Sequence, residues 1–331
     1  MLLRWFTSYS PILQIIIPLL ALASWIPYHY TIAYTPISTD ESLINYFFPN
    51  ASAIEAYPLL RTAIHFMLML SGAIFILRIF IRFNLVTQRS YVISILYITI
   101  SSLVLVNHYI LISLLANLIL LIIYFKLFAM YETNTPVKNV FEISILLSLG
   151  TILNSSFIFI LPPVIYGIYT VRNDLNIKSG IALLLGIFIP IYLVGSIWYL
   201  KNGNLNVFFN YFTRVFFEKQ IIPALSEVYI VSLIFIGIIL LMGIFWLYKE
   251  RSRKIGIRRY NNIQVIIILY HLSIFLIFDF VQWHTIIWAA IPISFILTNW
   301  YLTFRRKRIL QISIIIILLL FLTNITHSFL S

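Results

Sequence analysis

The sequence predicts an all-α, polytopic integral membrane protein. Three observations predict this fold class. Of the 331 residues, 62% are hydrophobic and only 10% are charged, whereas about 25% of the residues in a soluble domain are charged. The apolar residues form runs of about 20, the length that a helix needs to cross the hydrocarbon core of a bilayer. The charged residues fall in the gaps between these runs.

Eleven apolar runs are the predicted transmembrane helices, because a backbone without water must form its hydrogen bonds within its own segment. They cover residues 11–30, 59–82, 90–106, 109–129, 140–154, 157–171, 180–200, 228–248, 263–279, 284–304 and 309–328. Pro162-Pro163, Pro190 and Pro292 lie inside runs, where we expect them to kink or break the helices. Asn154-Ser155-Ser156 marks either a tight turn or a break in one long helix. The basic residues on both sides favour the turn.

The basic residues predict the orientation. When the gaps are assigned alternately to two sides, 18 of the 22 Lys and Arg residues fall on one side, together with the amino terminus and Arg4. By the positive-inside rule this side is cytoplasmic. An odd number of spans then puts the carboxyl terminus in the periplasm. Residues 1–331 are predicted to be one transmembrane domain of the inner membrane, and the run 11–30 is too long for a signal-peptide core, so we expect it to be retained.

Composition also excludes several classes of function. The net charge of +12 is explained by cytoplasmic helix flanks, which contact membrane lipids, so no nucleic-acid partner is expected. The absence of Cys excludes disulfides and thiolate metal sites. The GxGxxG, Walker A, HExxH and GxSxG motifs are missing from the sequence. Nucleotide-driven transport, zinc proteolysis and a hydrolase nucleophile elbow therefore have no support.

Two outer gaps are longer than a turn, and both belong to the predicted membrane domain. The outer loop 31–58 contains the acidic pair Asp40-Glu41. The outer segment 201–227 has apolar residues at helical spacing and polar residues off that stripe, as in a helix that lies in the membrane interface. The stripe consists of Phe208, Phe212, Val215 and Phe216, and the polar residues are Asn210, Arg214 and Lys219.

The outer carboxylates are the candidate catalytic groups. Asp40 and Glu41 can act as a general base towards a hydroxyl or hold a divalent cation, the only cofactor that the sequence suggests. The alternative is a pair of solvated carboxylates beside a helix that begins at Ser42. The spans contain few ionisable groups, with His271 the clear mid-span case, which argues against an ion-coupled transporter.

The outer cations are candidate phosphate ligands. Arg61, Arg214 and Lys219 can hold phosphate oxygens, and His284 lies in an outer turn on the same side. The alternatives are that Arg61 extends to lipid headgroups and that His284 is an ordinary interfacial residue.

With this topology, Asp40-Glu41 within STDESL and the stretch His284 to Leu302, the chain resembles GT-C-type glycosyltransferases that use polyprenyl-phosphate sugars. The resemblance implies transfer of a sugar from a polyprenyl-phosphate donor to an envelope glycan or lipid on the periplasmic side. Asp40 would be the base, Glu41 would orient it or hold a metal, and Arg61, Arg214, Lys219 and His284 would bind phosphate.

The amino-terminal stretch RWFTSYSPILQ also resembles a family of Bacteroidota inner-membrane proteins, which implies a compartment but no activity. Two other classes of function stay open. The chain can be a non-catalytic subunit or scaffold of an envelope complex, or a passive transporter of lipids or small solutes.

Overall fold

The computed structural model describes residues 11–31, 57–85, 90–102, 110–132, 136–172, 176–217, 227–249, 255–277, 286–304 and 307–330. Within these ranges the chain forms twelve α-helices and one 3₁₀ helix, η1, and no strand. In chain order they are α2 (Pro11–Thr31), α5 (Pro58–Arg82), α6 (Val92–Ser102), α7 (Ile110–Ala129), α8 (Pro136–Leu153), η1 (Ser155–Ile160), α9 (Leu161–Arg172), α10 (Ile177–Asn202), α11 (Asn206–Phe217), α12 (Glu227–Lys249), α13 (Ile255–Ile277), α14 (Ile286–Thr303) and α15 (Lys307–Leu330). The all-α prediction is confirmed, and each predicted run overlaps a helix.

Four of these helices are long and apolar enough to cross a membrane. The qualifying stretches are Thr62–Arg82, Leu111–Ala129, Pro136–Leu153 and Ile177–Asn202. Six further apolar helical stretches have 10–17 described residues each. Helix α13 begins at Ile255, before the predicted run at 263, because the polar residues ahead of that run continue the same helix.

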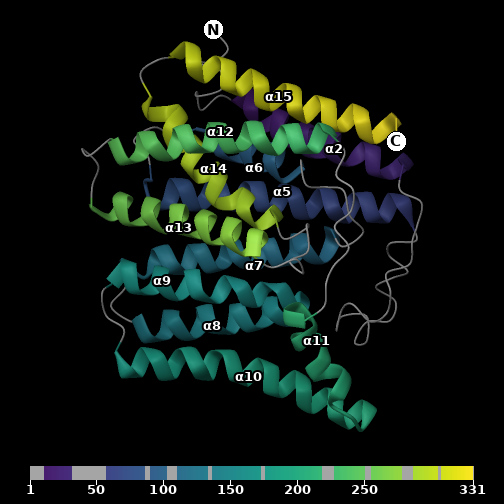
Figure 1. Cartoon of the computed structure of the whole chain (residues 1–331), viewed down its shortest axis with the longest axis vertical. Coiled ribbons are helices and arrows are strands. Elements are labelled where there is room, and N and C mark those ends of the chain that lie inside the picture. Colours follow the sequence, from purple (N-terminus) through teal and green to yellow (C-terminus); the bar gives the residue numbers. More distant parts are fainter. Residues whose placement is uncertain are drawn as a thin grey trace.

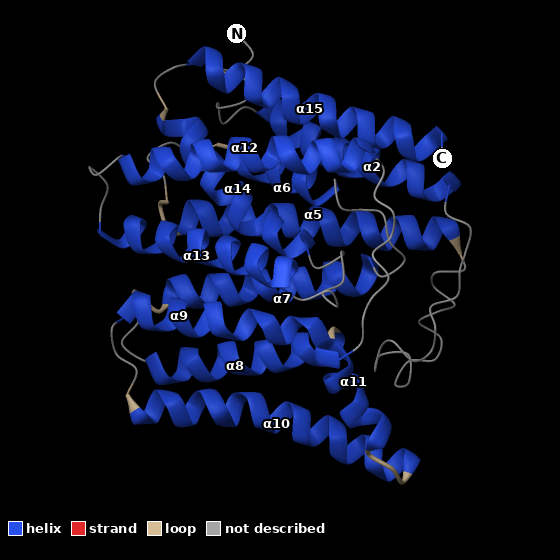
Figure 2. Ribbon diagram, viewed as in Figure 1, coloured by secondary structure: helices blue, strands red, loops and turns tan. Residues whose placement is uncertain are grey.

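The helices lie side by side with their long axes roughly aligned, from α10 at one edge to α15 at the other (Figure 1). Helix covers almost all of the drawn ribbon (Figure 2). Helix α6 lies inside this bundle, where it packs against α2, α5, α14 and α15, and every one of its residues is buried. At the α10 edge, α10 packs mainly on α8.

Helices α8 and α10 approach each other closely at Gly186. A Cβ atom on Gly186 would lie 2.5 Å from Cβ of Ser144 and 2.8 Å from the main-chain oxygen of Phe141. A main-chain oxygen cannot rotate away, so only glycine permits this approach. The most extensive helix pair of the bundle therefore depends on one missing side chain.

The chain reverses direction after α8, as the tight-turn alternative predicted. The side chain of Asn154 accepts a hydrogen bond from the Ser156 amide at 2.9 Å and begins η1. Asn is a favoured residue at such a position because its side-chain oxygen satisfies an amide that lacks a helical partner. The ring of Phe157 then lies against Gly150, where it leaves no room for a Cβ atom.

The predicted effect of proline is partly wrong. Pro162 and Pro163 lie in the first turn of α9, where a missing amide proton costs no helical hydrogen bond. They therefore begin α9, and the predicted run 157–171 is divided between η1 and α9 directly before them. Pro190 and Pro292 lie inside α10 and α14, and both helices continue through them.

Helix α11 is the predicted amphipathic helix. Phe208 and Tyr211 are buried with Ile152 of α8 and Trp198 of α10, and Phe212 packs against this cluster. The predicted stripe omitted Tyr211, and the side chains of Val215 and Phe216 lie outside the described part. Helix α11 is therefore attached to the ends of α8 and α10 by aromatic packing.

Candidate functional site

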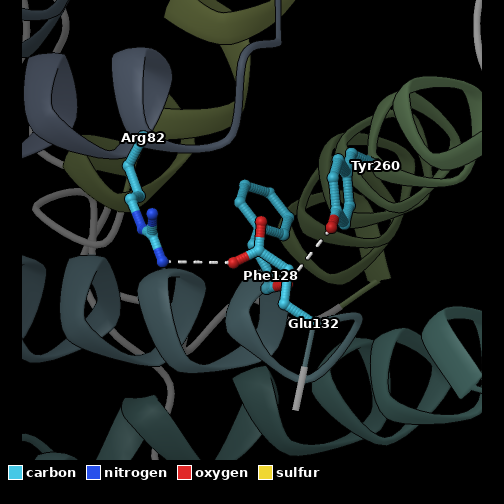
Figure 3. Close-up of polar contacts among 4 residues, drawn as sticks. All are labelled: Arg82, Phe128, Glu132 and Tyr260. Carbon is cyan, nitrogen blue, oxygen red and sulfur yellow. Dashed lines mark hydrogen bonds and ion pairs between the residues drawn. The ribbon is translucent and has the colours of Figure 1, made fainter.

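Basic residues of α5, α7 and α8 form ion pairs with two glutamates. Arg82 Nη2 lies 3.3 Å from Glu132 Oε2, as drawn in Figure 3. Lys126 Nζ lies 2.6 Å from Glu142 Oε2, and Lys138 Nζ lies 3.9 Å from Glu142 Oε1. These pairs bring together the ends of α5 and α7 and the beginning of α8.

The beginning of α13 joins the same end of the bundle. The Tyr260 hydroxyl donates to the main-chain oxygen of Phe128 at 3.1 Å (Figure 3). Arg259 Nη1 donates to the main-chain oxygen of Val171, near the end of α9, at 3.0 Å. We call this region the basic end. It is defined by Arg82, Lys126, Lys138, Arg258 and Arg259.

The opposite end of the bundle is marked by α11, and we call it the α11 end. The Tyr211 hydroxyl donates to the main-chain oxygen of Ile152, near the last residue of α8, at 3.1 Å. Burial raises the pKa of the Tyr211 hydroxyl, so it keeps the proton that this bond requires. The Trp198 indole donates to the main-chain oxygen of Asn204 at 3.0 Å and holds the connection from α10 to α11.

Two of the predicted phosphate ligands lie on helices that reach the α11 end. Arg61 is in the first turn of α5, a helix of 25 residues and so about 37 Å long, whose other end carries Arg82. Arg214 lies on α11. The two helices have different neighbours, since α5 packs against α2, α6 and α7, whereas α11 packs against η1 and the ends of α8 and α10. The side chains of Arg61 and Arg214 are outside the described part.

The remaining predicted site residues lie outside the described ranges. They are Asp40, Glu41, Lys219 and His284. His65, one turn after Arg61 on α5, is described and is buried at 4% exposure. Among the described residues, no group of three or more His, Asp or Glu side chains is placed to hold a metal ion.

The described interior contains hydrogen-bonded polar residues that are not among the predicted site residues. Asn117 Nδ2 of α7 donates to the Tyr97 hydroxyl of α6 at 2.7 Å, and the Ser94 hydroxyl donates to the main-chain oxygen of Ala73 at 2.7 Å. These bonds join α6 to α5 and α7 inside an apolar bundle. Interhelical bonds of this kind are common where helices pack in a membrane.

A second buried polar group lies nearer the basic end, on α7, α13 and α14. It consists of Tyr124, Asn261, Gln264 and Asn299, each at most 8% exposed. Asn299 Nδ2 donates to Asn261 Oδ1 at 3.0 Å. Their signal in the sequence is the presence of amide side chains inside or beside apolar runs.

Comparisons of the chain with protein-family models, with curated proteins and with solved structures found no match. The class of protein is therefore inferred from the helices of the structure alone. It is an all-helical protein with apolar helices long enough to cross a membrane.

Proposed function

We propose that the chain is a multi-pass protein of the inner membrane, with eleven transmembrane helices, a cytoplasmic basic end and a periplasmic α11 end. Large apolar side chains on the outside of the bundle support membrane embedding. Phe188, Leu184 and Leu200 of α10, for example, are 61%, 68% and 84% exposed. Extended apolar surface of this kind is costly in water, whereas lipid chains cover it without cost.

The orientation can be tested by cysteine labelling, because the chain contains no Cys of its own. Asn210→Cys on α11 and Lys178→Cys at the start of α10 introduce one exposed thiol near each end. With a membrane-impermeant maleimide on spheroplasts, we expect Asn210→Cys to react and Lys178→Cys to react only after permeabilisation. The opposite pattern would reject the proposed orientation.

We further propose that the α11 end carries a GT-C-like transferase site for a polyprenyl-phosphate sugar. The observation that supports it is that Arg61 and Arg214, two predicted phosphate ligands, belong to helices that reach this end of the bundle. Helix α11 is attached there by Tyr211 and Phe208. A lipid-linked phosphate lies at the leaflet boundary, which is the depth of this end in the proposed orientation.

In the proposed reaction, Asp40 accepts the proton of an acceptor hydroxyl, whose oxygen attacks the anomeric carbon of the donor sugar. The bond between that carbon and the phosphate oxygen breaks, and the electron pair leaves with the polyprenyl phosphate. Arg61, Arg214 and Lys219, with His284, stabilise the charge that develops on this phosphate. Glu41 orients Asp40 or holds a divalent cation.

The activity can be tested with purified protein in proteoliposomes that contain a radiolabelled polyprenyl-phosphate sugar and an envelope lipid extract. Loss of a general base reduces rates by about 100-fold or more, so we expect Asp40→Asn to reduce transfer strongly. Arg61→Ala should also reduce transfer, because the charge that develops on the leaving phosphate loses a ligand. Glu55→Gln and Lys201→Ala are matched controls, since they neutralise outer charges that the proposal does not use. Full transfer by both Asp40→Asn and Arg61→Ala would reject the transferase.

The exposed face of α10 favours a second candidate, a non-catalytic subunit of an envelope complex. Phe188 and Tyr192 stack on this face with ring centroids 5.6 Å apart and are 61% and 60% exposed. Under this proposal a partner helix covers them. Co-purification of a stoichiometric partner that is lost in Phe188→Ala, with no transferase activity in wild type, would support the subunit.

A further inference from the structure

Gln264 is a buried polar side chain of α13. It is 2% exposed, and within the described part of the chain neither Nε2 nor Oε1 forms a hydrogen bond. A buried amide without partners loses its bonds to water and gains none in return. An unpaired group of this kind indicates that a bound molecule or ion supplies the missing hydrogen bonds.

The pairing of α13 with α14 fixes the position of Gln264. Asn261 of α13 bonds to Asn299 of α14, and the two helices run in opposite directions (Figure 1). Gln264 lies one turn further along α13 than Asn261. Phe295 lies one turn back along α14 from Asn299. Gln264 is therefore level with Phe295, because residues three or four apart share one helix face.

Tyr124 of α7 packs against Phe295, the residue of α14 that is level with Gln264. Its ring centroid lies 6.4 Å from that of Phe295, and its hydroxyl is also buried without a partner among the described residues. Asn299 Oδ1 is a further buried acceptor that no described residue pairs with. The junction of α7, α13 and α14 thus contains one unpaired amide donor, two unpaired carbonyl acceptors and one hydroxyl.

We propose that this junction is an internal water site, in which ordered water bonds to Gln264, Tyr124 and Asn299. Water suits the group because it both donates and accepts, and buried waters typically bond to two to four such atoms. A metal cation does not suit it, because the three side chains offer only three neutral oxygen atoms, whereas hard cations require about six oxygen ligands. An anion does not suit it, because two of the three side chains offer carbonyl oxygens.

The site can be tested by solid-state NMR of the full-length protein in lipid bilayers with ¹⁵N-labelled glutamine. The chain has six glutamines, and Gln264→Met identifies the Gln264 side-chain signal by removing it. We expect magnetisation to pass from water to the Gln264 NH₂ group despite its burial, and also to that of the half-buried Gln311. A dry Gln264 signal beside a hydrated Gln311 signal would overturn the water site.

Thermal unfolding gives an independent readout, since hydrated and dry sites change Tm in opposite directions. Met has a similar length to Gln and no strong hydrogen-bonding group. If water fills the site, Gln264→Met lowers Tm, because Tyr124, Asn299 and the water lose a partner. If the site is dry, the substitution removes an unpaired amide and raises Tm. We expect a lower Tm, with little change in the matched Gln311→Met, and a higher Tm would overturn the proposal.

Discussion

Tyr260 donates its hydroxyl to the main-chain oxygen of Phe128 at 3.1 Å, and the two rings lie with their centroids 4.4 Å apart. One residue of α13 therefore holds the end of α7 by a hydrogen bond and by packing at once. Arg82 and Glu132 pair close by (Figure 3), but their side chains are largely exposed. The buried contact is therefore expected to stabilise the basic end more than this ion pair does.

Tyr260→Phe should destabilise the protein by about 1 kcal/mol, the net contribution of one hydrogen bond. The ring stays in place, so packing is retained. Thermal unfolding in detergent measures the change. Tyr131→Phe is the matched control, because Tyr131 is 50% exposed and lies edge-on to Tyr260. The control should change stability by less than about 0.5 kcal/mol, and equal effects of the two substitutions would contradict the buried bond.

Gly186→Ala should separate α8 from α10. The new Cβ atom would lie 2.8 Å from the Phe141 main-chain oxygen, so the backbones must move apart, at a cost of about 1–3 kcal/mol.

Gly237→Ala is the control for this substitution. Gly237 also lies in a helix, α12, and a Cβ atom there meets nothing within 4 Å. Alanine is the better helix former by up to about 1 kcal/mol, so this variant should unfold at the same or a higher temperature. A Gly186→Ala protein as stable as Gly237→Ala would show that α8 and α10 do not pack as described.

The sequence predicted the helices well because their signal is local. A run such as residues 59–82 is apolar over its whole length, and α5 matches it within one residue at its start. The turn at Asn154 could also be predicted, since the polar triplet Asn154-Ser155-Ser156 and the basic residues on both sides of the two runs indicate the same reversal. The packing of the helices against one another could not be predicted, because it depends on contacts between residues far apart in the sequence. Asn261 and Asn299, for example, are 38 residues apart.

The candidate site was less predictable than the fold. The alternation of charged gaps predicts which end of the bundle a residue lies at, but it does not predict which helices are neighbours. Arg61 and Arg214 were predicted to act together, and they belong to helices with different packing partners. Gln264 was overlooked for the opposite reason, since one neutral amide hardly changes the hydropathy of its run. Only the surrounding helices reveal that it is buried without a partner.

Glu142→Gln should weaken the basic end slightly and in a salt-dependent way. Glu142 pairs with both Lys126 and Lys138, and its side chain is 30% exposed. We expect a loss of up to about 1 kcal/mol, since exposed pairs contribute little and solvent screens this one in part. Glu132→Gln removes a more exposed pair with Arg82 and should have almost no effect.

Unfolding at low and high NaCl concentration tests this comparison. The difference between Glu142→Gln and wild type should shrink at high salt, because ions screen the lost attraction. A difference that is unaffected by salt would mean that Glu142 acts through packing and not through charge.

Phe208→Ala should detach α11 from the bundle. Phe208 is 3% exposed, it lies against Gly195, and its ring centroid is 6.3 Å from that of Trp198. Removing a buried Phe side chain costs about 3–5 kcal/mol in a well-packed site. Hydrogen–deuterium exchange of the α11 amides should therefore rise, and transfer from a polyprenyl-phosphate sugar should fall if Arg214 acts from α11.

Phe209→Ala is the control one residue away, because Phe209 is 59% exposed. Faster exchange in α11 of Phe208→Ala with unchanged transfer would exclude Arg214 from the proposed site, whereas unchanged exchange would contradict the packing of Phe208.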